Sequence, residues 1–242
     1  MNRLGIPISQ LESVIKILKA LSLDQWPETV CTHLATAEDP KDPLTLIQMT
    51  RFQDIRRRFL AEKETILFHF ANSSACWNAR HYSLDGLSEI ARPGLSLYGV
   101  LPFPEAGRSD LHPVMELQYQ ILATQDLSVG DRIGYGGTYR VSGKNHPNGL
   151  RIAILGTGYA DGLSRNQGNS GSVYWKGRAL PLLGRVSMDL SAVECIQGMK
   201  AGDWVNFLGV GIDPWTQARS AGTIPYEILT SVSKRVFRQL SD

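Results

Sequence analysis

Two segments of the sequence place a reactive side chain among residues that allow tight turns. Gly158-Tyr159-Ala160-Asp161-Gly162 holds a tyrosine near two glycines, an arrangement that can present the phenol to a cavity for proton transfer. Asp-Gly is also a common turn pair, and a purely structural tyrosine is the simpler interpretation of this segment alone. Gly184-Arg185-Val186-Ser187-Met188-Asp189 ends on a thioether and a carboxylate, although a methionine is by default a packing residue.

Two other segments contain the residue types that bind phosphate. Asn72-Ser73-Ser74 follows an apolar run, and amide and hydroxyl groups at the end of a parallel strand suit phosphate oxygens. In Ala91-Arg92-Pro93-Gly94, Arg92 is a fixed cation, and the backbone N–H groups of Gly94 and Leu95 are further donors. The alternatives are a helix N-cap for the first segment and a solvated loop arginine for the second.

Composition limits the classes of protein that this chain can be. Its 242 residues are 43% hydrophobic, and the net charge of +2 provides no bulk attraction for nucleic acid or anionic membranes. No apolar run approaches the ~20 residues of a membrane helix, and neither a P-loop nor a G-x-G-x-x-G motif occurs. Cys31, Cys76 and Cys195 are scattered without metal-site spacing. We therefore expect a cytoplasmic globular protein that binds no metal, no nucleic acid and no membrane.

The first part of the chain alternates between helix and strand patterns. The predicted elements are helices over residues 11–21 and 44–59 and strands over residues 66–70 and 95–101. His33 and His69 each lie within an apolar run, where a hydrogen-bonded core histidine is the ordinary interpretation. Alternation of this kind is typical of βα units with a parallel sheet, which we assign to a domain over residues 1–110.

From about residue 111 the pattern changes to a period of two. The predicted strands cover residues 114–121, 151–155, 173–175 and 204–208. Glycine, asparagine and aspartate separate them, which predicts an antiparallel β domain over residues 111–242. One helix is predicted over residues 225–237, with Pro225 in its first turn, and the Pro- and Gly-rich residues 102–112 are the expected linker.

Taken together and in this order, the segments resemble those of alanine racemase, the fold-type III pyridoxal-phosphate enzyme that interconverts L- and D-alanine. Met1-Asn2-Arg3-Leu4-Gly5 is similar to the end of the family's Asp-Thr-Gly-Met-x-Arg-Leu-Gly motif, and Thr32-His33-Leu34-Ala35 to its Thr-His-Phe-Ala segment. The further motifs of the family match, in order, Asn72-Ser73, 91–94, 158–162, Met188-Asp189 and Tyr226-Glu227. The resemblance covers essentially the whole chain. It implies an α/β plus all-β protein, the C-terminal part of a (β/α)8 TIM barrel followed by an antiparallel β domain.

The resemblance implies a catalytic centre built around pyridoxal 5′-phosphate, which a lysine near the start of the barrel holds as a Schiff base. Tyr159 is implied as one of two bases that exchange the substrate's Cα proton, with His33 beside it as the start of a relay. Arg92 would face the pyridine nitrogen, with His69 behind it. Because a guanidinium keeps its proton, Arg92 would leave the ring unprotonated, which favours racemisation over side reactions.

The remaining implied contacts concern the phosphate, the substrate and a second subunit. The implied phosphate and cofactor ligands are Asn72, Ser73, the backbone of Gly94 and Leu95, and Tyr226. Arg3 and Met188 would contact the substrate or cofactor, with Asp189 next to them. In the family the tyrosine and methionine serve the barrel of the partner subunit, so a head-to-tail homodimer is implied. Alanine is the implied substrate, and supply of D-alanine for peptidoglycan is the implied role.

The chain departs from the family pattern at its beginning. The resemblance starts inside the Met-x-Arg-Leu-Gly motif, so we expect a racemase truncated at its N-terminus, without the first barrel strands. The family's Val-Lys-Ala-x-Ala-Tyr-Gly-His context surrounds none of the eight lysines, Lys16, Lys19, Lys41, Lys63, Lys144, Lys176, Lys200 and Lys234. Three interpretations stay open: part of an ordinary alanine racemase, a non-catalytic remnant that acts only through dimerisation, or a racemase for another small amino acid such as serine.

Overall fold

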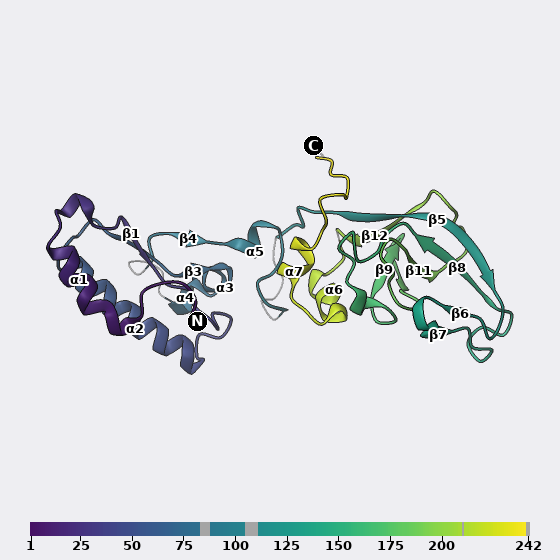
Figure 1. The fold of residues 1–242 in the computed structure, drawn as a ribbon, viewed down its shortest axis with the longest axis horizontal. Coiled ribbons are helices and arrows are strands. Elements are labelled where there is room, and N and C mark those ends of the chain that lie inside the picture. Colours follow the sequence, from purple (N-terminus) through teal and green to yellow (C-terminus); the bar gives the residue numbers. More distant parts are fainter. Residues whose placement is uncertain (83–87, 105–110, 210, 241–242) are drawn as a thin grey trace. The chain divides into compact units, whose positions relative to one another are not determined.

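The computed structural model describes residues 1–82, 88–104, 111–209 and 211–240. The chain folds as two units, Met1–Leu111 and His112–Asp242, and each unit has its own hydrophobic core (Figure 1). The expected linker at residues 102–112 falls partly on residues 105–110, which lie outside the described residues.

Unit 1, Met1–Leu111, combines short strands with helices, as its alternating sequence pattern predicts. Its strands are β1 (Thr29–Cys31), β2 (Leu67–His69), β3 (Ala71–Asn72) and β4 (Ala91–Arg92). Its helices are the 3-10 turns η1 (Ile8–Gln10) and η2 (Leu23–Gln25) and the α-helices α1 (Leu11–Lys19), α2 (Pro43–Leu60), α3 (Ser73–Trp77), α4 (Ala79–Tyr82) and α5 (Gly94–Leu97). β1 pairs with β2 and β3 with β4, both in parallel register. In the described parts of the chain, no helix is both long and apolar enough to cross a membrane.

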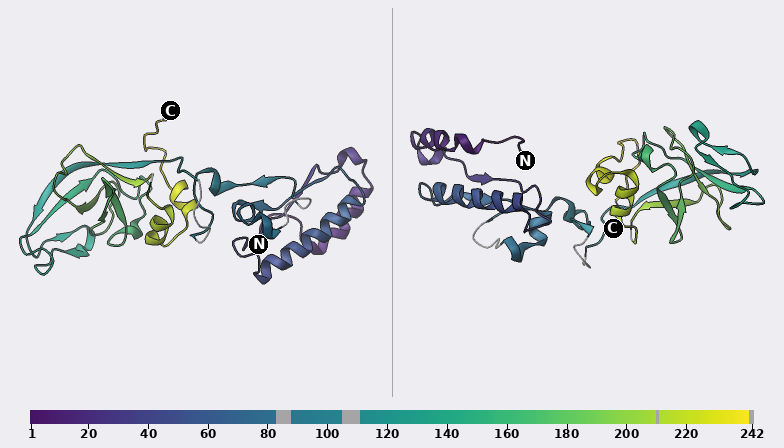
Figure 2. Two further views of the ribbon diagram at one scale, coloured as in Figure 1. Left: turned by 180° about the vertical axis from the view of Figure 1, so that it is seen from behind. Right: turned by 90° about the horizontal axis from the view of Figure 1, so that it is seen from below.

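Helix α2, the long helix of unit 1 in Figures 1 and 2, begins at a clear sequence signal. The Asp42 carboxylate accepts a hydrogen bond of 2.7 Å from the N–H two residues on, and a proline occupies the first helical position. On the buried face, Phe52 packs edge-on against Phe68 and Phe70, with ring centroids 6.0 and 5.6 Å apart. This aromatic cluster holds α2 against the strand segment that leads into the candidate site.

One predicted strand of unit 1 is wrong. Residues 95–101 contain the short helix α5 and not a strand, and Leu95 is the buried residue of that helix. The chain turns at Gly99, whose φ of +71° lies in the left-handed region that glycine adopts without strain. Because this apolar run is short and bounded by a proline and a glycine, its periodicity could not separate a strand from a single helical turn.

Unit 2, His112–Asp242, is built on antiparallel strands. The strands are β5 (Leu117–Leu127), β6 (Arg132–Ile133), β7 (Tyr139–Arg140), β8 (Leu150–Leu155), β9 (Ser172–Trp175), β10 (Arg178–Pro181), β11 (Ser191–Glu194) and β12 (Trp204–Leu208). Six of them form one sheet in the order β10-β9-β12-β5-β8-β11, and β6 pairs with β7. The helical segments are η4 (Tyr135–Gly137), η5 (Arg165–Gln167), α6 (Pro214–Ala221) and α7 (Pro225–Thr230). Helices α6 and α7 lie side by side at one end of the sheet (Figures 1 and 2).

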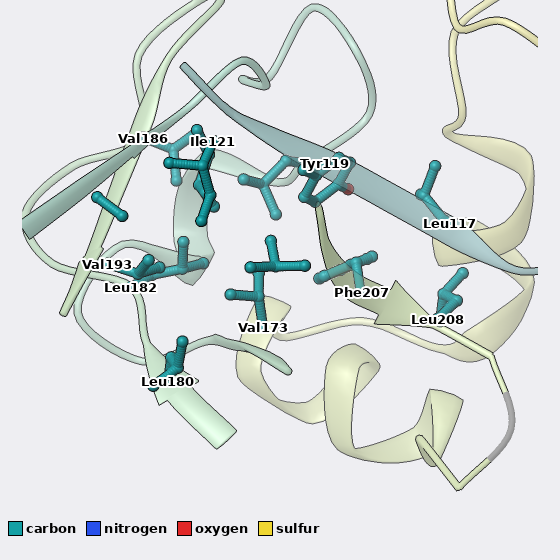
Figure 3. Packing of buried hydrophobic residues seen from close by; sticks show 14 of the residues in the cluster. Leu117, Tyr119, Ile121, Val173, Leu180, Leu182, Val186, Val193, Phe207 and Leu208 are labelled. Atoms are coloured by element: carbon teal, nitrogen blue, oxygen red, sulfur yellow. The ribbon is translucent and has the colours of Figure 1, made fainter. Parts of the chain in front are cut away.

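The core of unit 2 follows from the alternation along β5. Tyr119 and Ile121 are buried, whereas the neighbouring Leu122 is 51% exposed. The ring of Tyr119 packs on that of Phe207 from β12, with centroids 5.5 Å apart, and Val173 of β9 lies in the same interior (Figure 3). The described strands of unit 2 therefore agree with the antiparallel β domain that the period-two pattern predicts.

Helix α7 is shorter than its sequence pattern predicts, because it ends at Thr230 and not near Phe237. The chain beyond it bonds to an earlier turn of the unit. The Ser231 hydroxyl donates to the carbonyl oxygen of Gly162 at 3.1 Å, and the Ser233 N–H donates to that of Asp161 at 3.1 Å. These long-range hydrogen bonds replace those that would have continued the helix.

The packing of β12 against β5 leads to a stability prediction. Replacing the buried Phe207 by alanine removes the ring that contacts Tyr119 and leaves a cavity, so we expect a loss of about 3–5 kcal/mol in the free energy of unfolding. Leu122→Ala, at an exposed position of the same sheet, is the control and should cost less than about 0.5 kcal/mol. Urea unfolding followed by far-UV circular dichroism measures both variants. Equal losses would contradict the assignment of this core.

Candidate active site

In unit 1, the polar residues singled out from the sequence meet where short parallel strands end. β3 and β4 are in register with Asn72 opposite Arg92, and His33 follows the end of β1. The Arg92 Nη2 donates to the carbonyl oxygen of Thr32 at 2.6 Å, and the Asn72 Nδ2 lies 3.4 Å from the His33 Nε2. The carboxyl ends of three strands thus bring a cation, an amide and an imidazole together, the usual location of sites in parallel α/β folds.

Helix α2 fixes the backbone on both sides of Leu34, the residue after His33, through Gln48. The side-chain amide of Gln48 donates to the carbonyl oxygen of His33 at 2.9 Å and accepts from the N–H of Ala35 at 2.9 Å. Sequence reasoning missed this residue. Helical spacing could have indicated it, because Gln48 lies four residues before the buried Phe52 and so on the same face of the helix.

The imidazoles of this site are held in a positive environment. Burial, together with the positive charges of Arg92, Arg3 and the N-terminus, lowers the pKa of His33. Burial and the charge of Arg92 likewise lower the pKa of His69. Both histidines are therefore biased toward the neutral form.

Several buried polar atoms around Arg92 are without a hydrogen-bond partner among the described residues. They include the Arg92 Nε and the His69 Nδ1. His69 is linked to Arg92 through the backbone of Thr32, whose N–H donates to the His69 carbonyl oxygen at 3.1 Å while its carbonyl oxygen accepts from Arg92. Unsatisfied buried polar groups are rare in folded proteins, so these atoms are candidates for contact with a ligand.

The expected phosphate ligands of unit 1 also cluster. Ser73 is 2% exposed, and its hydroxyl accepts a hydrogen bond of 3.4 Å from the N–H of Ser96. Gly94 and Leu95 precede Ser96 on α5, and the Ser96 Oγ is another buried atom without a partner in the described chain. Asn72 is in part a helix cap, as the alternative interpretation held, because its side-chain oxygen accepts from Ala75 N–H at 3.0 Å.

In unit 2, the turn at Gly158–Gly162 packs directly on the loop that carries Met188. The N–H groups of Tyr159 and Ala160 donate to the carbonyl oxygens of Ser187 and Met188, each at 3.0 Å. A Cβ atom on Gly158 would lie 2.2 Å from the Met188 oxygen, so only glycine permits this approach. The side chains of Tyr159 and Met188 are 45% and 53% exposed.

A hollow of about 600 Å³ lies beside this loop, and it identifies a tyrosine that sequence reasoning missed. It is lined by Gly134, Tyr135, Gly136, Ser187, Met188, Asp189 and Leu190, and the Tyr135 side chain is 69% exposed. Tyr159 is not among the lining residues. Tyr135 lies directly between Gly134 and Gly136, and this tyrosine between two glycines is a sequence signal that could have found it.

Close backbone packing positions Tyr135 at the hollow. The glycines that flank it have positive φ angles of 70° and 74°, and a Cβ on Gly134 would lie 3.0 Å from the backbone nitrogen of Arg185. Asn169 braces the same region, because its side chain donates to the Thr138 hydroxyl at 3.1 Å and accepts from Gly184 N–H at 2.7 Å. The segment that carries Met188 is thus held next to Tyr135.

The other predicted residues of unit 2 are at its surface. Asp189 is exposed and its carboxylate accepts a hydrogen bond from Arg235. Tyr226 lies on α7 with 44% of its side chain exposed. The relay expected between His33 and Tyr159 joins residues of different units, and it stays a prediction.

Comparison with known proteins identifies the family. The chain matches the model of the alanine racemase N-terminal domain over residues 1–102 and that of the alanine racemase C-terminal domain over residues 114–240. It belongs to the alanine racemase family. Curated alanine racemases from Aeromonas hydrophila and Acidiphilium cryptum are 34% and 35% identical to it, over 99% and 98% of its length. The chain spans only 64% and 63% of the length of these two relatives.

Solved alanine racemases share the fold. The biosynthetic alanine racemase from Pseudomonas aeruginosa aligns with a TM-score of 0.85 at 31% identity, covering 100% of this chain and 64% of that one. The alanine racemase from Bartonella henselae, solved with covalently bound pyridoxal phosphate, aligns with a TM-score of 0.80 at 29% identity, covering 97% and 62%. The expected fold class, part of a TIM barrel followed by an antiparallel β domain, is confirmed.

The electrostatics of this racemase-family site lead to a prediction for His33. We expect its imidazole to titrate below the ordinary value near ~6.5, and the pKa to rise in Arg92→Gln, which removes the nearby charge, but not in Arg92→Lys. Because the folded-state pKa is lowered, the unfolded chain binds more protons just below pH ~6.5, so this histidine reduces stability as the pH falls through that range. NMR titration of the ring Cε1–H signal measures the pKa. An unchanged pKa in Arg92→Gln would refute the coupling.

Proposed function

We propose that this chain is part of an alanine racemase that interconverts L- and D-alanine with pyridoxal 5′-phosphate and supplies D-alanine for peptidoglycan. The observation that carries the proposal is the Arg92 site, where the buried Nε of Arg92 and the buried Oγ of Ser96 are unpartnered in the described chain. These donors fit a ring nitrogen and a phosphate respectively. When bound, the cofactor supplies the electron sink that makes the substrate's Cα proton acidic.

The residues of unit 1 would hold the cofactor at its pyridine ring and at its phosphate. Arg92 would donate to the ring nitrogen, and because a guanidinium does not give up its proton, it would leave that nitrogen unprotonated and so limit side reactions. His33 and Asn72 would border the ring, with His69 behind Arg92. The phosphate would be held by Ser73, by the backbone of Gly94 and Leu95, and by Tyr226 from unit 2.

For proton transfer at the substrate's Cα we propose Tyr159, the tyrosine that the family motif indicates, with Met188 and Arg3 in contact with the substrate. The turn that carries Tyr159 packs directly on the Met188 loop, and the Tyr159 side chain is 45% exposed. Tyr135 is a second candidate on the same unit, because it lines the hollow with Met188.

Unit 2 is proposed to serve the site of a second copy in a head-to-tail homodimer. Tyr135, Tyr159, Met188 and Leu190 expose apolar surface on neighbouring loops of this unit, with exposed fractions of 69%, 45%, 53% and 45%. Exposed aromatic and thioether side chains of this kind are typical of surfaces that a partner covers. The three cysteines carry free thiols, which supports a reducing compartment such as the cytoplasm.

Cofactor recognition is tested with a probe that cannot form a Schiff base. We expect the chain to bind 4′-deoxypyridoxine 5′-phosphate more tightly than the same ring without phosphate. Ser73→Ala, which removes a buried hydroxyl, should weaken phosphate binding about tenfold. Calorimetric titration measures each affinity, and Ser74→Ala, the same change one residue later, is the control.

The result for the control decides the assignment. If Ser74→Ala weakens binding as much as Ser73→Ala, or if phosphate adds no affinity, the phosphate site is misassigned. If the chain binds neither probe, the alternative of a remnant that acts only through dimerisation is favoured.

A pair of tyrosine variants in the natural protein that contains this chain tests the proton-transfer group. Loss of a general acid–base residue costs about 10²–10⁴ in rate, so Tyr159→Phe should reduce alanine racemisation by that factor while Tyr135→Phe loses less than tenfold. Formation of D-alanine measures both. The opposite ranking would assign that role to Tyr135, and faster turnover of serine than of alanine would replace the proposed substrate.

A further inference from the structure

Arg235, in the segment after α7, contacts two loops that are distant from it in the sequence. Its Nε donates to the Asp161 Oδ1 at 2.7 Å, and its Nη2 donates to the Asp189 Oδ1 at 2.6 Å. The planar guanidinium holds its donors in fixed directions, so one side chain sets the separation of two carboxylates. Asp161 belongs to the turn with Tyr159, and Asp189 directly follows Met188.

The Asp161 end of this contact is anchored inside the turn. The Asp161 side chain is only 16% exposed, and its second carboxylate oxygen accepts from the Gly158 N–H at 2.9 Å. Arg235 therefore acts on the same carboxylate that closes the turn. Through Gly158, that turn packs on the carbonyl groups of Ser187 and Met188. The position of the Asp161 carboxylate is therefore fixed relative to the Met188 loop.

The backbone that carries Arg235 is fixed to the same turn. The Ser233 N–H donates to the Asp161 carbonyl oxygen, and the Ser231 hydroxyl to that of Gly162, each at 3.1 Å. A Cβ atom on Gly162 would lie 2.6 Å from the Ser231 carbonyl oxygen, so the two segments are in direct contact. The backbone next to Arg235 is thus held by hydrogen bonds to the same turn that contains Asp161.

The Asp189 end is the adjustable one. Asp189 has a side chain that is 57% exposed, in a short loop that the Ser187 N–H closes by donating to the Leu190 carbonyl oxygen at 2.9 Å. This loop supplies Met188 and Leu190 to the hollow beside Tyr135. A change in the position of Asp189 would therefore move one wall of that hollow.

We propose that Arg235 is a positioning residue that holds the Met188 loop at a set distance from the Tyr159 turn, and so fixes part of the wall of the hollow that Tyr135 also lines. The proposal rests on the proposed function in one respect, namely that the hollow takes part in the reaction. The geometric part concerns this chain alone.

The signals of methionine methyl groups test the geometric part without substrate or cofactor. The chain has five methionines, so a sample labelled at the methyl carbon gives few and assignable signals. In Arg235→Gln we expect the Met188 signal to shift and broaden, while that of Met199, 5% exposed in the core of the same unit, stays unchanged. Arg235→Lys should restore part of the shift, because an ammonium can pair with one carboxylate but cannot bridge both.

A matched control separates this contact from any surface ion pair. Arg219→Gln removes the arginine that pairs with Asp213 at 3.4 Å in the same unit, and it should leave the Met188 signal unchanged. An unchanged Met188 signal in Arg235→Gln, or an equal change at Met199, would overturn the proposal. If Arg235→Gln fails to fold, Arg235→Lys is judged by the same criterion.

Turnover in the natural protein tests the functional part. Small displacements of positioning groups cost up to about 100-fold in rate, so we expect Arg235→Gln to lower kcat/KM between 10- and 100-fold and Arg235→Lys to recover part of the loss. A shifted Met188 signal with unaltered turnover would show a structural clamp alone and overturn the positioning role. Failure of the proposed function is distinguishable, because a protein inactive before any substitution can still show the methyl shift.

Discussion

The contact between the Gly158 turn and the carbonyl groups of Ser187 and Met188 is the constraint on which the organisation of unit 2 depends. Two backbone hydrogen bonds of 3.0 Å cross this contact, and a side chain at position 158 would prevent both. Once the two loops are joined, Met188 and Tyr135 line one hollow, and Asp161 and Asp189 come within reach of one guanidinium. The absence of a side chain at position 158 therefore permits the contact that brings Met188, Asp161 and Asp189 close together.

Unit 1 depends on a comparable constraint of a different kind, the parallel register of β3 and β4. Because Asn72 is opposite Arg92, the amide and the guanidinium leave the strands at the same level, next to the loop of His33. Gln48 then holds that loop through its backbone. In both units, hydrogen bonds to main-chain atoms thus set the positions from which the side chains extend.

Much of this arrangement was predictable from the sequence. The helix after Asp42 and the strand at 204–208 were found because each has a clean period and clear boundary residues. The family motifs brought Arg92, Asn72 and Met188 to notice, and the structure places the first two of them together.

The features that the sequence did not predict depend mainly on contacts between segments far apart in the chain. The end of helix α7 is set by bonds to Gly162 and Asp161, which no local pattern near residue 231 reveals. The double contact of Arg235 joins Asp161 and Asp189 from two other loops, so no pattern around residue 235 predicts it. Residues 95–101 were predicted as a strand but contain helix α5, because a helix of only four residues is too short for its periodicity to show.

The central strand β5 has a consequence for the order of folding. Its Leu127 pairs with Leu150 of β8, a partner close in the chain, whereas its Gln120 pairs with Trp204 of β12, a far more distant one. Closing the shorter loop costs less entropy, so the β5–β8 ladder is favoured to form before β12 joins it. The contact of Arg235 with Asp161 likewise joins residues far apart in the chain, and its loop closure also costs more entropy than that of β5 and β8. During synthesis, the Met188 loop therefore lacks the Arg235 contact until the segment after α7 has been made.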